Sequence, residues 1–95
     1  MPAYVVVQIS IHDPLRYEEY MKIAPPSIAA YGGRYIVRGG QSEVLEGSWQ
    51  PRRLVVLEFS SVDRARSWWH SPEYASAKAL RQRCADTEML LIQGS

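Results

Sequence analysis

Five charged residues in the middle of the chain have the types and the spacing needed to bind or convert a small acidic molecule. They are Arg34, Arg38, Glu46, Arg53 and Glu58. Arg34 and Arg38 flank the strand-like stretch Tyr-Ile-Val, and their even spacing predicts that both side chains lie on one face of a strand. A guanidinium binds a carboxylate through two parallel hydrogen bonds, so a small organic acid is the expected ligand. The alternative is a structural network of arginine–glutamate ion pairs that joins strands or subunits.

Glu58 is the best candidate for a general base. It lies between Leu57 and Phe59 in a strand-like run, and burial would raise the pKa of its carboxyl group towards neutrality. An arginine beside it would instead hold the carboxylate ionised. We therefore expect an unpaired Glu58 to be catalytic, together with Arg38, and a paired Glu58 to be structural.

His12 and His70 are the remaining candidates for acid–base catalysis, because imidazole titrates near neutral pH. His12 follows the first strand-like run, and His70 ends the segment that contains two adjacent tryptophans. The alternative for each is an ordinary surface histidine in a loop. The two histidines show neither His-x-His nor His-Glu-x-x-His spacing, so we expect no metal site. Neither is singled out as an axial haem ligand, so we expect no cofactor.

Aromatic residues form a second group of candidate ligand-binding side chains. Trp68 and Trp69 are adjacent, and adjacent residues of a helix point about 100° apart, so only one of them faces the sheet. The other is expected to cover a pocket mouth, a subunit edge or solvent. Aromatic side chains in a concave site suit a planar or apolar ligand, whereas packing in the core or at an interface is their commoner use. The complete predicted ligand-binding set is Tyr4, Gln8, Arg34, Glu46, Arg53, Trp68, Trp69 and Tyr74.

The composition is that of one small folded domain covering residues 1–95. Eleven basic and ten acidic residues give a net charge of +1, which argues against a nucleic-acid-binding domain that neutralises phosphates. The arginines of the helical segments are expected at the surface: Arg16, Arg64, Arg66, Arg81 and Arg83. The sequence contains neither an apolar run of about 18 residues nor a basic leader, so we expect a cytoplasmic protein that does not bind a membrane.

The pattern of β-branched and turn residues predicts four strands. They are expected over residues 3–11, 34–38, 53–59 and 87–93, and residues 43–46 are expected as a short strand or a bulged continuation. Residues 5–10 and 55–60 are similar at an offset of 50, which indicates two related halves. With one helical region after the first strand and another after the third, the order is βαββαβ. This order predicts an α+β, ferredoxin-like fold.

Two helical regions connect these strands. The first should begin with Asp13 as its N-cap and be broken or kinked near Ala24 by the two prolines that follow it. The second should be capped by Asp63 and interrupted at Ser71-Pro72, and should then continue over residues 73–85.

The alternation of side chains in the first strand predicts a homodimer. Val5 and Val7 belong to the apolar set that should face the helices, whereas Tyr4, Val6 and Gln8 should face away from them. A sheet with helices on one side leaves its other face bare. We expect two such faces to meet in a homodimer and to enclose a partly polar cavity between the sheets. The alternative is a cavity filled by side chains.

Four segments of the chain resemble the DUF1330 family. They are Tyr31–Gly40 (Tyr-Gly-Gly-Arg-Tyr-Ile-Val-Arg-Gly-Gly), Leu45–Gly47, Arg53–Phe59 and Trp68–Tyr74, which contains Ser-Pro-Glu-Tyr. The resemblance covers nearly the whole chain. It implies membership of the dimeric α/β-barrel superfamily, in which two ferredoxin-like subunits pair sheet to sheet. Relatives in that superfamily include cofactor-free monooxygenases, muconolactone isomerases, chlorite dismutase-like haem proteins and stress-responsive proteins, but the resemblance to DUF1330 itself implies no activity.

Two classes of function follow from these observations. The first is an enzyme of the cofactor-independent oxygenase, isomerase or lyase type that acts on a small acidic or aromatic metabolite. The second is a non-catalytic dimer that binds a small molecule or acts in a stress response. An enzyme should leave an acid or a base unpaired in an open cavity, whereas a binding protein can have every charge paired.

Overall fold

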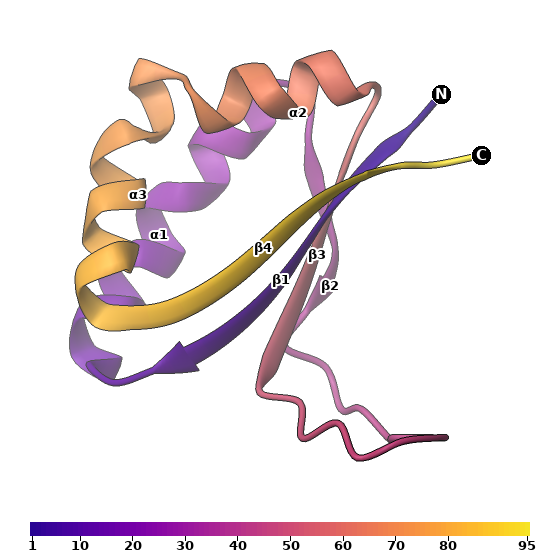
Figure 1. Cartoon of the computed structure of the whole chain (residues 1–95). Helices are drawn as coiled ribbons and strands as arrows, with labels where there is room; N and C mark the ends of the chain where they lie inside the picture. The colour runs from indigo at the N-terminus through magenta and orange to yellow at the C-terminus, as the bar shows by residue number, and fades with distance from the viewer.

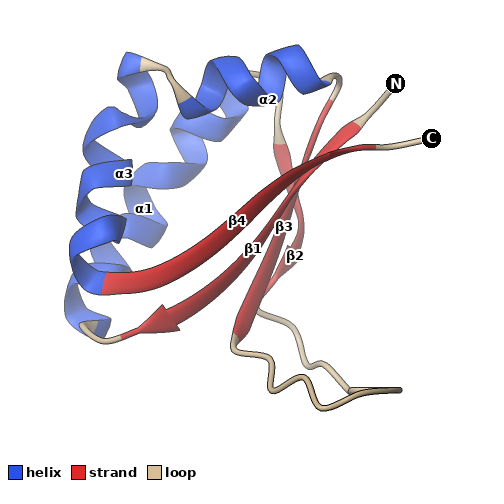
Figure 2. Ribbon diagram, in the orientation of Figure 1, coloured by secondary structure: helices blue, strands red, loops and turns tan.

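A four-stranded antiparallel sheet forms one layer of the protein, and three helices form the other (Figures 1 and 2). The computed structural model describes residues 1–95. In chain order the elements are β1 (Ala3–Ile11), α1 (Pro14–Ala30), β2 (Arg34–Arg38), β3 (Arg53–Phe59), α2 (Val62–Trp69), α3 (Pro72–Cys84) and β4 (Ala85–Gln93). The strand order is β2-β3-β1-β4. This confirms the predicted α+β, ferredoxin-like arrangement, with the second helical region divided into α2 and α3.

Side chains alternate across the sheet as the sequence predicts. Val5 and Val7 of β1 are buried beneath the helices, and Leu57 of β3, which pairs with Val5, is buried on the same side. We call the opposite side the open face, because no helix covers it (Figure 1). The open face carries Tyr4, Val6, Gln8, Val56, Glu58 and Leu90. The core therefore lies between the helices and one face of the sheet only.

Helix α1 runs without interruption through Pro25 and Pro26, so the predicted break near Ala24 is wrong. Each proline lacks the backbone N–H that would donate to the carbonyl four residues earlier. For Pro25 that carbonyl is the carbonyl of Met21, and it instead accepts a hydrogen bond of 3.0 Å from Arg38 Nη2. A side chain from the sheet thus replaces one of the missing helical hydrogen bonds.

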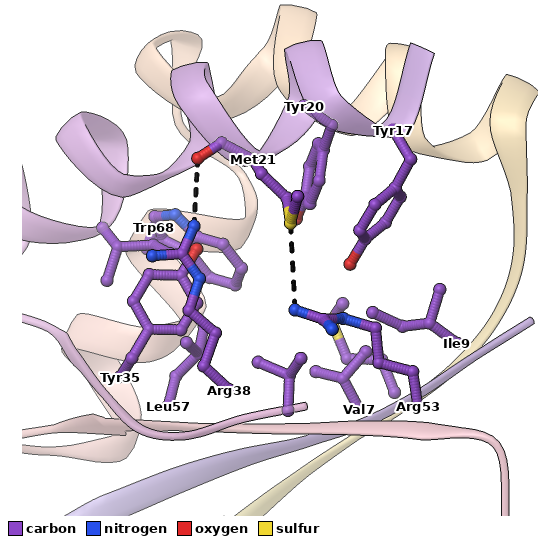
Figure 3. A pocket seen from close by; sticks show the side chains of 13 residues that line it. Val7, Ile9, Tyr17, Tyr20, Met21, Tyr35, Arg38, Arg53, Leu57 and Trp68 are labelled. Carbon is purple, nitrogen blue, oxygen red and sulfur yellow. Dashed lines mark hydrogen bonds between the residues drawn. The ribbon is translucent and has the colours of Figure 1, made fainter. Parts of the chain in front are cut away.

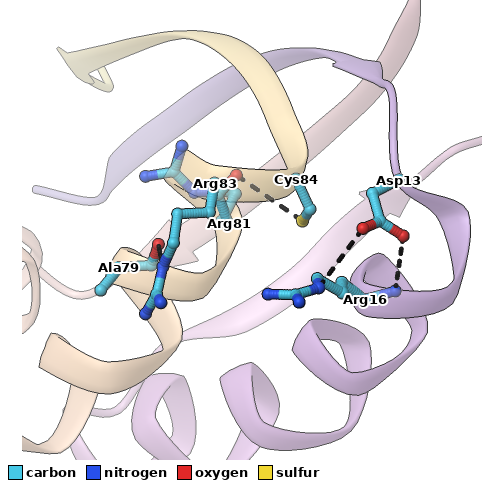
Figure 4. Close-up of polar contacts among 6 residues, drawn as sticks. All are labelled: Asp13, Arg16, Ala79, Arg81, Arg83 and Cys84. Carbon is cyan, nitrogen blue, oxygen red and sulfur yellow. Dashed lines mark hydrogen bonds and ion pairs between the residues drawn. The ribbon is translucent and has the colours of Figure 1, made fainter.

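Short polar side chains begin the helices. Asp13 caps α1 as predicted and accepts a hydrogen bond of 3.3 Å from the backbone N–H of Arg16 (Figure 4). The cap of α2 is Ser61 rather than Asp63, whose prediction as the cap is wrong. Ser61 has the extended backbone of a capping residue, and its hydroxyl accepts a 3.1 Å hydrogen bond from Arg64. Asp63 lies in the first turn, where its charge suits the positive end of the helix.

The segment 39–52 between β2 and β3 contains no strand, so the predicted strand at 43–46 is absent. This segment extends beyond the end of the sheet as a long loop (Figure 1).

β4 begins at Ala85, two residues earlier than predicted. None of the three helices is both long enough and apolar enough to cross a membrane.

Gly33, which joins α1 to β2, has no room for a side chain. A Cβ atom at this position would lie 2.5 Å from the Phe59 ring and 2.8 Å from Ile28 Cγ2. We expect Gly33→Ala to lower the free energy of unfolding by about 1–3 kcal/mol, as overpacking of a core does. Urea denaturation measures the change. Gly40→Ala is the control, because a Cβ there would meet no atom within 4 Å, and it should change stability by less than about 0.5 kcal/mol. Equal losses in the two variants would contradict the prediction.

Candidate functional site

A bulge in β2 separates the two arginines that the sequence placed on one face. The pairing register with β3 shifts by one residue between Tyr35 and Val37. One extra residue reverses the side-chain alternation beyond it. Arg34 therefore lies on the open face, whereas Arg38 lies beneath α1 and contacts Met21. The prediction that the two arginines share a face is wrong for this reason.

The open face carries one strong ion pair. Arg34 Nη2 and Nε are each 2.7 Å from Glu58 Oε1. Glu58 is thus paired with an arginine, as expected if its role is structural. Tyr4 lies opposite Glu58 on β1. Further along the same face, Gln8 Oε1 accepts a hydrogen bond of 3.0 Å from Trp49 Nε1. These contacts join strands and a loop to one another.

The predicted charged cluster does not form, because its members lie on different parts of the protein. Glu46 is exposed in the loop 39–52. His12 is exposed, with its Nε2 4.0 Å from Asp86 Oδ1. His70 ends α2 and is also exposed. Neither histidine and no glutamate lines the pocket that contains the remaining two arginines.

That pocket lies between α1 and the sheet and contains Arg38 and Arg53 (Figure 3). Its volume is about 20 Å³, which is room for one water molecule. Tyr17 and Tyr20 extend from α1 towards the sheet, and Tyr35 lies on the opposite wall (Figure 3). The two arginines therefore face the helices, on the opposite side of the sheet from the cavity that the sequence predicted.

Arg53 enters the pocket from the start of β3 with one donor unsatisfied. Its Nε is buried and has no hydrogen-bond partner. Its Nη2 donates to Met21 Sδ at 3.8 Å, and a thioether is a weak acceptor. The guanidinium carbon lies 5.8 Å from the centre of the Tyr17 ring. Arg53 thus presents two N–H groups for which the protein supplies no strong acceptor.

Arg38 lies at the solvent-exposed side of the same pocket. Its Nη2 donates to the Met21 carbonyl at 3.0 Å, and its guanidinium carbon lies 4.4 Å from the centre of the Tyr35 ring. The side chain remains exposed. Pro25 of α1 thus has a consequence for the site, because the carbonyl that it leaves free holds Arg38 at the pocket mouth.

The electrostatic character of the pocket is positive and rich in donors. No carboxylate is among its lining residues, and the arginine ion pairs of the chain involve Arg16, Arg34 and Arg66 instead. Burial raises the pKa of Tyr35 to about 12 and also raises the pKa of Tyr20, so both hydroxyl groups keep their protons at neutral pH. Such a site favours an anion with several hydrogen-bond acceptors.

The predicted aromatic residues divide as helix geometry requires. Trp68 is 1% exposed, lines the pocket and packs against Tyr74, with ring centroids 4.1 Å apart. Trp68 Nε1 also donates to Ser27 Oγ at 3.2 Å. Trp69 is half-buried outside the pocket, with Lys78 Nζ 4.4 Å from its ring centre. Of the two tryptophans, only Trp68 can contact a molecule in this pocket.

The sequence as a whole matches a family of unknown function. The family described as "Domain of unknown function (DUF1330)" covers residues 2–95. The chain belongs to the DUF1330 family. No curated protein matches this DUF1330 sequence.

Solved structures share the fold of this DUF1330 protein. RPA0582, a protein of unknown function from Rhodopseudomonas palustris, is 18% identical with a TM-score of 0.78, over 99% of this chain and 82% of that chain. SnoaB, a cofactor-independent oxygenase from Streptomyces nogalater, is 14% identical with a TM-score of 0.70, over 99% of this chain and 93% of that chain. A conserved protein from Methanosarcina mazei Go1 is 15% identical with a TM-score of 0.56, over 100% of this chain and 95% of that chain. At these identities the similarity shows the fold alone.

Several pocket residues of the DUF1330 chain were not predicted from its sequence. They are Tyr17, Tyr20, Met21 and Tyr35. The spacing of the first three indicates one face of a helix, but it does not show which strand residues that face meets. The strand that contains Tyr35 was predicted from the sequence. The bulge that follows Tyr35 was not predicted.

Arg81 is a further residue that the sequence misplaced. It was expected on the helix surface, yet it is 3% exposed. Arg81 follows Tyr74 by seven residues, so both lie on one face of α3, and Arg81 Nε is 3.3 Å from the Tyr74 hydroxyl. The seven-residue spacing between Tyr74 and Arg81 was the one signal in the sequence that could have indicated a shared, buried face. The prediction failed because arginine is rarely buried.

Proposed function

We propose that this DUF1330 protein is a homodimer that binds a small organic carboxylate in the pocket between α1 and the sheet. The observation that carries the proposal is the buried Nε of Arg53, which has no partner. A buried N–H without an acceptor costs about 1–3 kcal/mol. A carboxylate would accept hydrogen bonds from Nε and Nη2 together. These charge-assisted bonds would replace the weak contact with the Met21 sulfur.

The pocket must widen to admit such a ligand, because its present volume is about 20 Å³. Met21 has an unbranched and flexible side chain, so it can move at low cost. Its movement would release Arg53 Nη2 and enlarge the pocket at the same time. The rings of Tyr17 and Tyr35 would then form the apolar walls around the ligand, which suits a small or planar acid.

The proposed dimer forms through the open face. The strand register aligns Val37, Val56, Val6 and Leu90 in one row across all four strands. Leu90 is 59% exposed and Ile92 is 49% exposed. A row of apolar side chains that is exposed at both of its ends supports an interaction site, and a second copy related by a twofold axis would cover both rows at once. A cavity between the two sheets would belong to this interface and would be separate from the pocket beneath α1.

Binding of propionate tests the proposed site, because propionate is a small carboxylate without other functional groups. We expect Arg53→Gln to weaken propionate binding roughly 10- to 100-fold, the loss that follows removal of a charge-assisted hydrogen-bonded pair. Titration of the ¹⁵N-labelled protein by NMR measures the affinity and shows whether α1 and β3 respond. Arg52→Gln is the matched control, because Arg52 is exposed and its side chain makes no hydrogen bond.

Two results would contradict the proposed site. One is a wild-type protein that shows no propionate-dependent shifts in α1 or β3. The other is an equal loss of affinity in Arg52→Gln and Arg53→Gln, which would indicate a general effect of net charge rather than a pocket.

A cofactor-independent oxygenase is the second candidate function, and the fold shared with SnoaB favours it. The donors of Arg53 and Tyr20 would stabilise an oxyanion formed in the pocket. No carboxylate or imidazole lines the pocket as a general base, so binding is the function that the geometry supports best. Mass spectrometry of small molecules that copurify with the protein separates the two candidates. A ligand recovered unchanged after incubation in air supports binding, and a gain of oxygen atoms supports the oxygenase.

A further inference from the structure

Behind the pocket wall lies a chain of three buried polar side chains, Arg81, Tyr74 and Tyr20. No carboxylate lies within ion-pair distance of Arg81. Arg81 Nε donates to the Tyr74 hydroxyl at 3.3 Å, and that hydroxyl is 2.9 Å from the hydroxyl of Tyr20. Tyr20 lines the pocket, whereas Tyr74 and Arg81 do not. The chain therefore connects a buried positive charge on α3 to the pocket wall on α1.

The chemistry of the three groups sets the direction of the hydrogen bonds. A guanidinium can only donate, so the Tyr74 oxygen is the acceptor for Arg81. Donation from a positive charge polarises the Tyr74 O–H and makes it the better donor of the two hydroxyls. Tyr74 therefore donates to Tyr20, and the hydrogen of Tyr20 has no acceptor in the protein. If Tyr20 donated to Tyr74 instead, the Tyr74 oxygen would accept from both Arg81 and Tyr20, and the polarised hydrogen of Tyr74 would have no acceptor.

The free hydrogen of Tyr20 is available to a molecule in the pocket. Tyr20 extends from α1 towards the sheet, whereas Arg38 and Arg53 enter from β2 and β3 (Figure 3). Burial raises the pKa of Tyr20, so its hydroxyl remains a donor and does not act as a base. The two arginines can together occupy both oxygens of a carboxylate. The Tyr20 hydrogen, which comes from the α1 side of the pocket, is then available to a further oxygen of the ligand.

We infer that the ligand carries a second oxygen acceptor beside its carboxylate, as a 2-oxo acid does, and that Tyr20 donates a hydrogen bond to this oxygen. Arg81 and Tyr74 are the positioning residues that hold the Tyr20 hydroxyl in the donating direction. This inference rests on the proposed function, because the arginines must bind the carboxylate for Tyr20 to meet the second oxygen.

Pyruvate and propionate are the probes that test the inference, because both are three-carbon carboxylates and pyruvate adds a keto oxygen. We expect wild-type protein to bind pyruvate roughly three- to tenfold more tightly than propionate, the effect of one net hydrogen bond. Tyr20→Phe keeps the ring and removes the donor. It should lower the affinity for pyruvate more than the affinity for propionate, so that the ratio of the two affinities falls to about one. NMR titration of the full chain measures both affinities.

Arg81 variants test the positioning role. Arg81→Met keeps an apolar side chain of similar length in the buried site and removes the donor to Tyr74. It should lower the preference for pyruvate while propionate binding persists, because the hydroxyl pair is then free to reverse. Arg81→Lys keeps a charged donor and should retain more of the preference than Arg81→Met. A purely structural role for Arg81 would change both affinities equally and leave their ratio intact.

The titrations test three claims separately: the carboxylate site, the hydrogen bond from Tyr20 to a second oxygen, and the positioning role of Arg81. Wild-type protein that binds both probes equally, with no effect of Tyr20→Phe, overturns the inference and leaves the proposed carboxylate site in place. Wild-type protein that binds neither probe overturns both. An unchanged ratio in Arg81→Met overturns the positioning role. If Arg81→Met does not fold, Arg81→Lys and Tyr20→Phe still decide the result, since neither removes a buried ring or a buried charge.

Discussion

Leu90→Glu should convert the proposed homodimer into a monomer of 10.8 kDa. Leu90 belongs to the apolar row that crosses the open face, where it pairs with Val6 of β1. In the proposed dimer this row is enclosed between two sheets. An uncompensated carboxylate enclosed there would cost several kcal/mol per subunit, and the twofold axis would apply the cost twice. Light scattering across a range of protein concentrations measures the shift in mass.

The matched control for this variant is Leu15→Glu. Leu15 is 77% exposed on the surface of α1, on the helical layer of the protein. The same change of residue type there should leave the dimer intact. Wild-type protein that remains at 10.8 kDa at every concentration would overturn the dimer proposal. A monomeric Leu15→Glu would show that added negative charge, rather than its position on the sheet, causes dissociation.

Trp68→Ala should cause the largest loss of stability among single substitutions in the pocket wall, about 3–5 kcal/mol. The Trp68 ring packs against Tyr74 and against Phe59, with a centroid separation of 5.6 Å for the second pair. Its loss leaves a cavity in the core and removes the donor to Ser27 Oγ. A loss of this size is a large part of the 5–15 kcal/mol that typically stabilises a small domain.

Trp69→Ala is the control, because it removes the same side chain from the next position of the same helix. Trp69 is half-buried, and its main polar neighbour is Lys78. We expect its loss to cost about 1 kcal/mol, close to the average for single substitutions. Urea denaturation should be performed at one fixed protein concentration, because dimerisation adds to the apparent stability. A greater loss in Trp69→Ala than in Trp68→Ala would contradict the assignment of Trp68 to the core.

Local patterns in the sequence were sufficient for the four strands and for the two faces of β1, but not for the absence of a strand at 43–46 or for the continuation of α1 through its prolines. Alternation in β1 predicted that Val5 and Val7 face the helices, because side chains of a strand alternate strictly between its two faces. The helical spacing of Trp68 and Trp69 likewise predicted that only one of them reaches the core. These predictions succeeded because each depends on residues that are close together in the chain.

The candidate site was only partly predictable. Arg53, Arg38 and Trp68 were named from the sequence and do line one pocket. Their expected companion Glu58 lies on the other face, paired with Arg34. The difference arises from the bulge in β2, a shift of one residue that depends on the pairing with β3 rather than on local composition.

The residue types and their alternation thus determined by themselves the four strands of the sheet, their order with the helical regions, and which apolar side chains of β1 face the helices. The tertiary structure alone decided where the arginines lie. Arg81 is buried because α3 packs against Tyr20 of α1, and Arg38 reaches α1 because Pro25 leaves a carbonyl free above the bulged strand. Both outcomes depend on contacts between segments distant in the chain. A side chain as long and as polar as arginine can satisfy its charge in several places, and only the packed structure selects one of them.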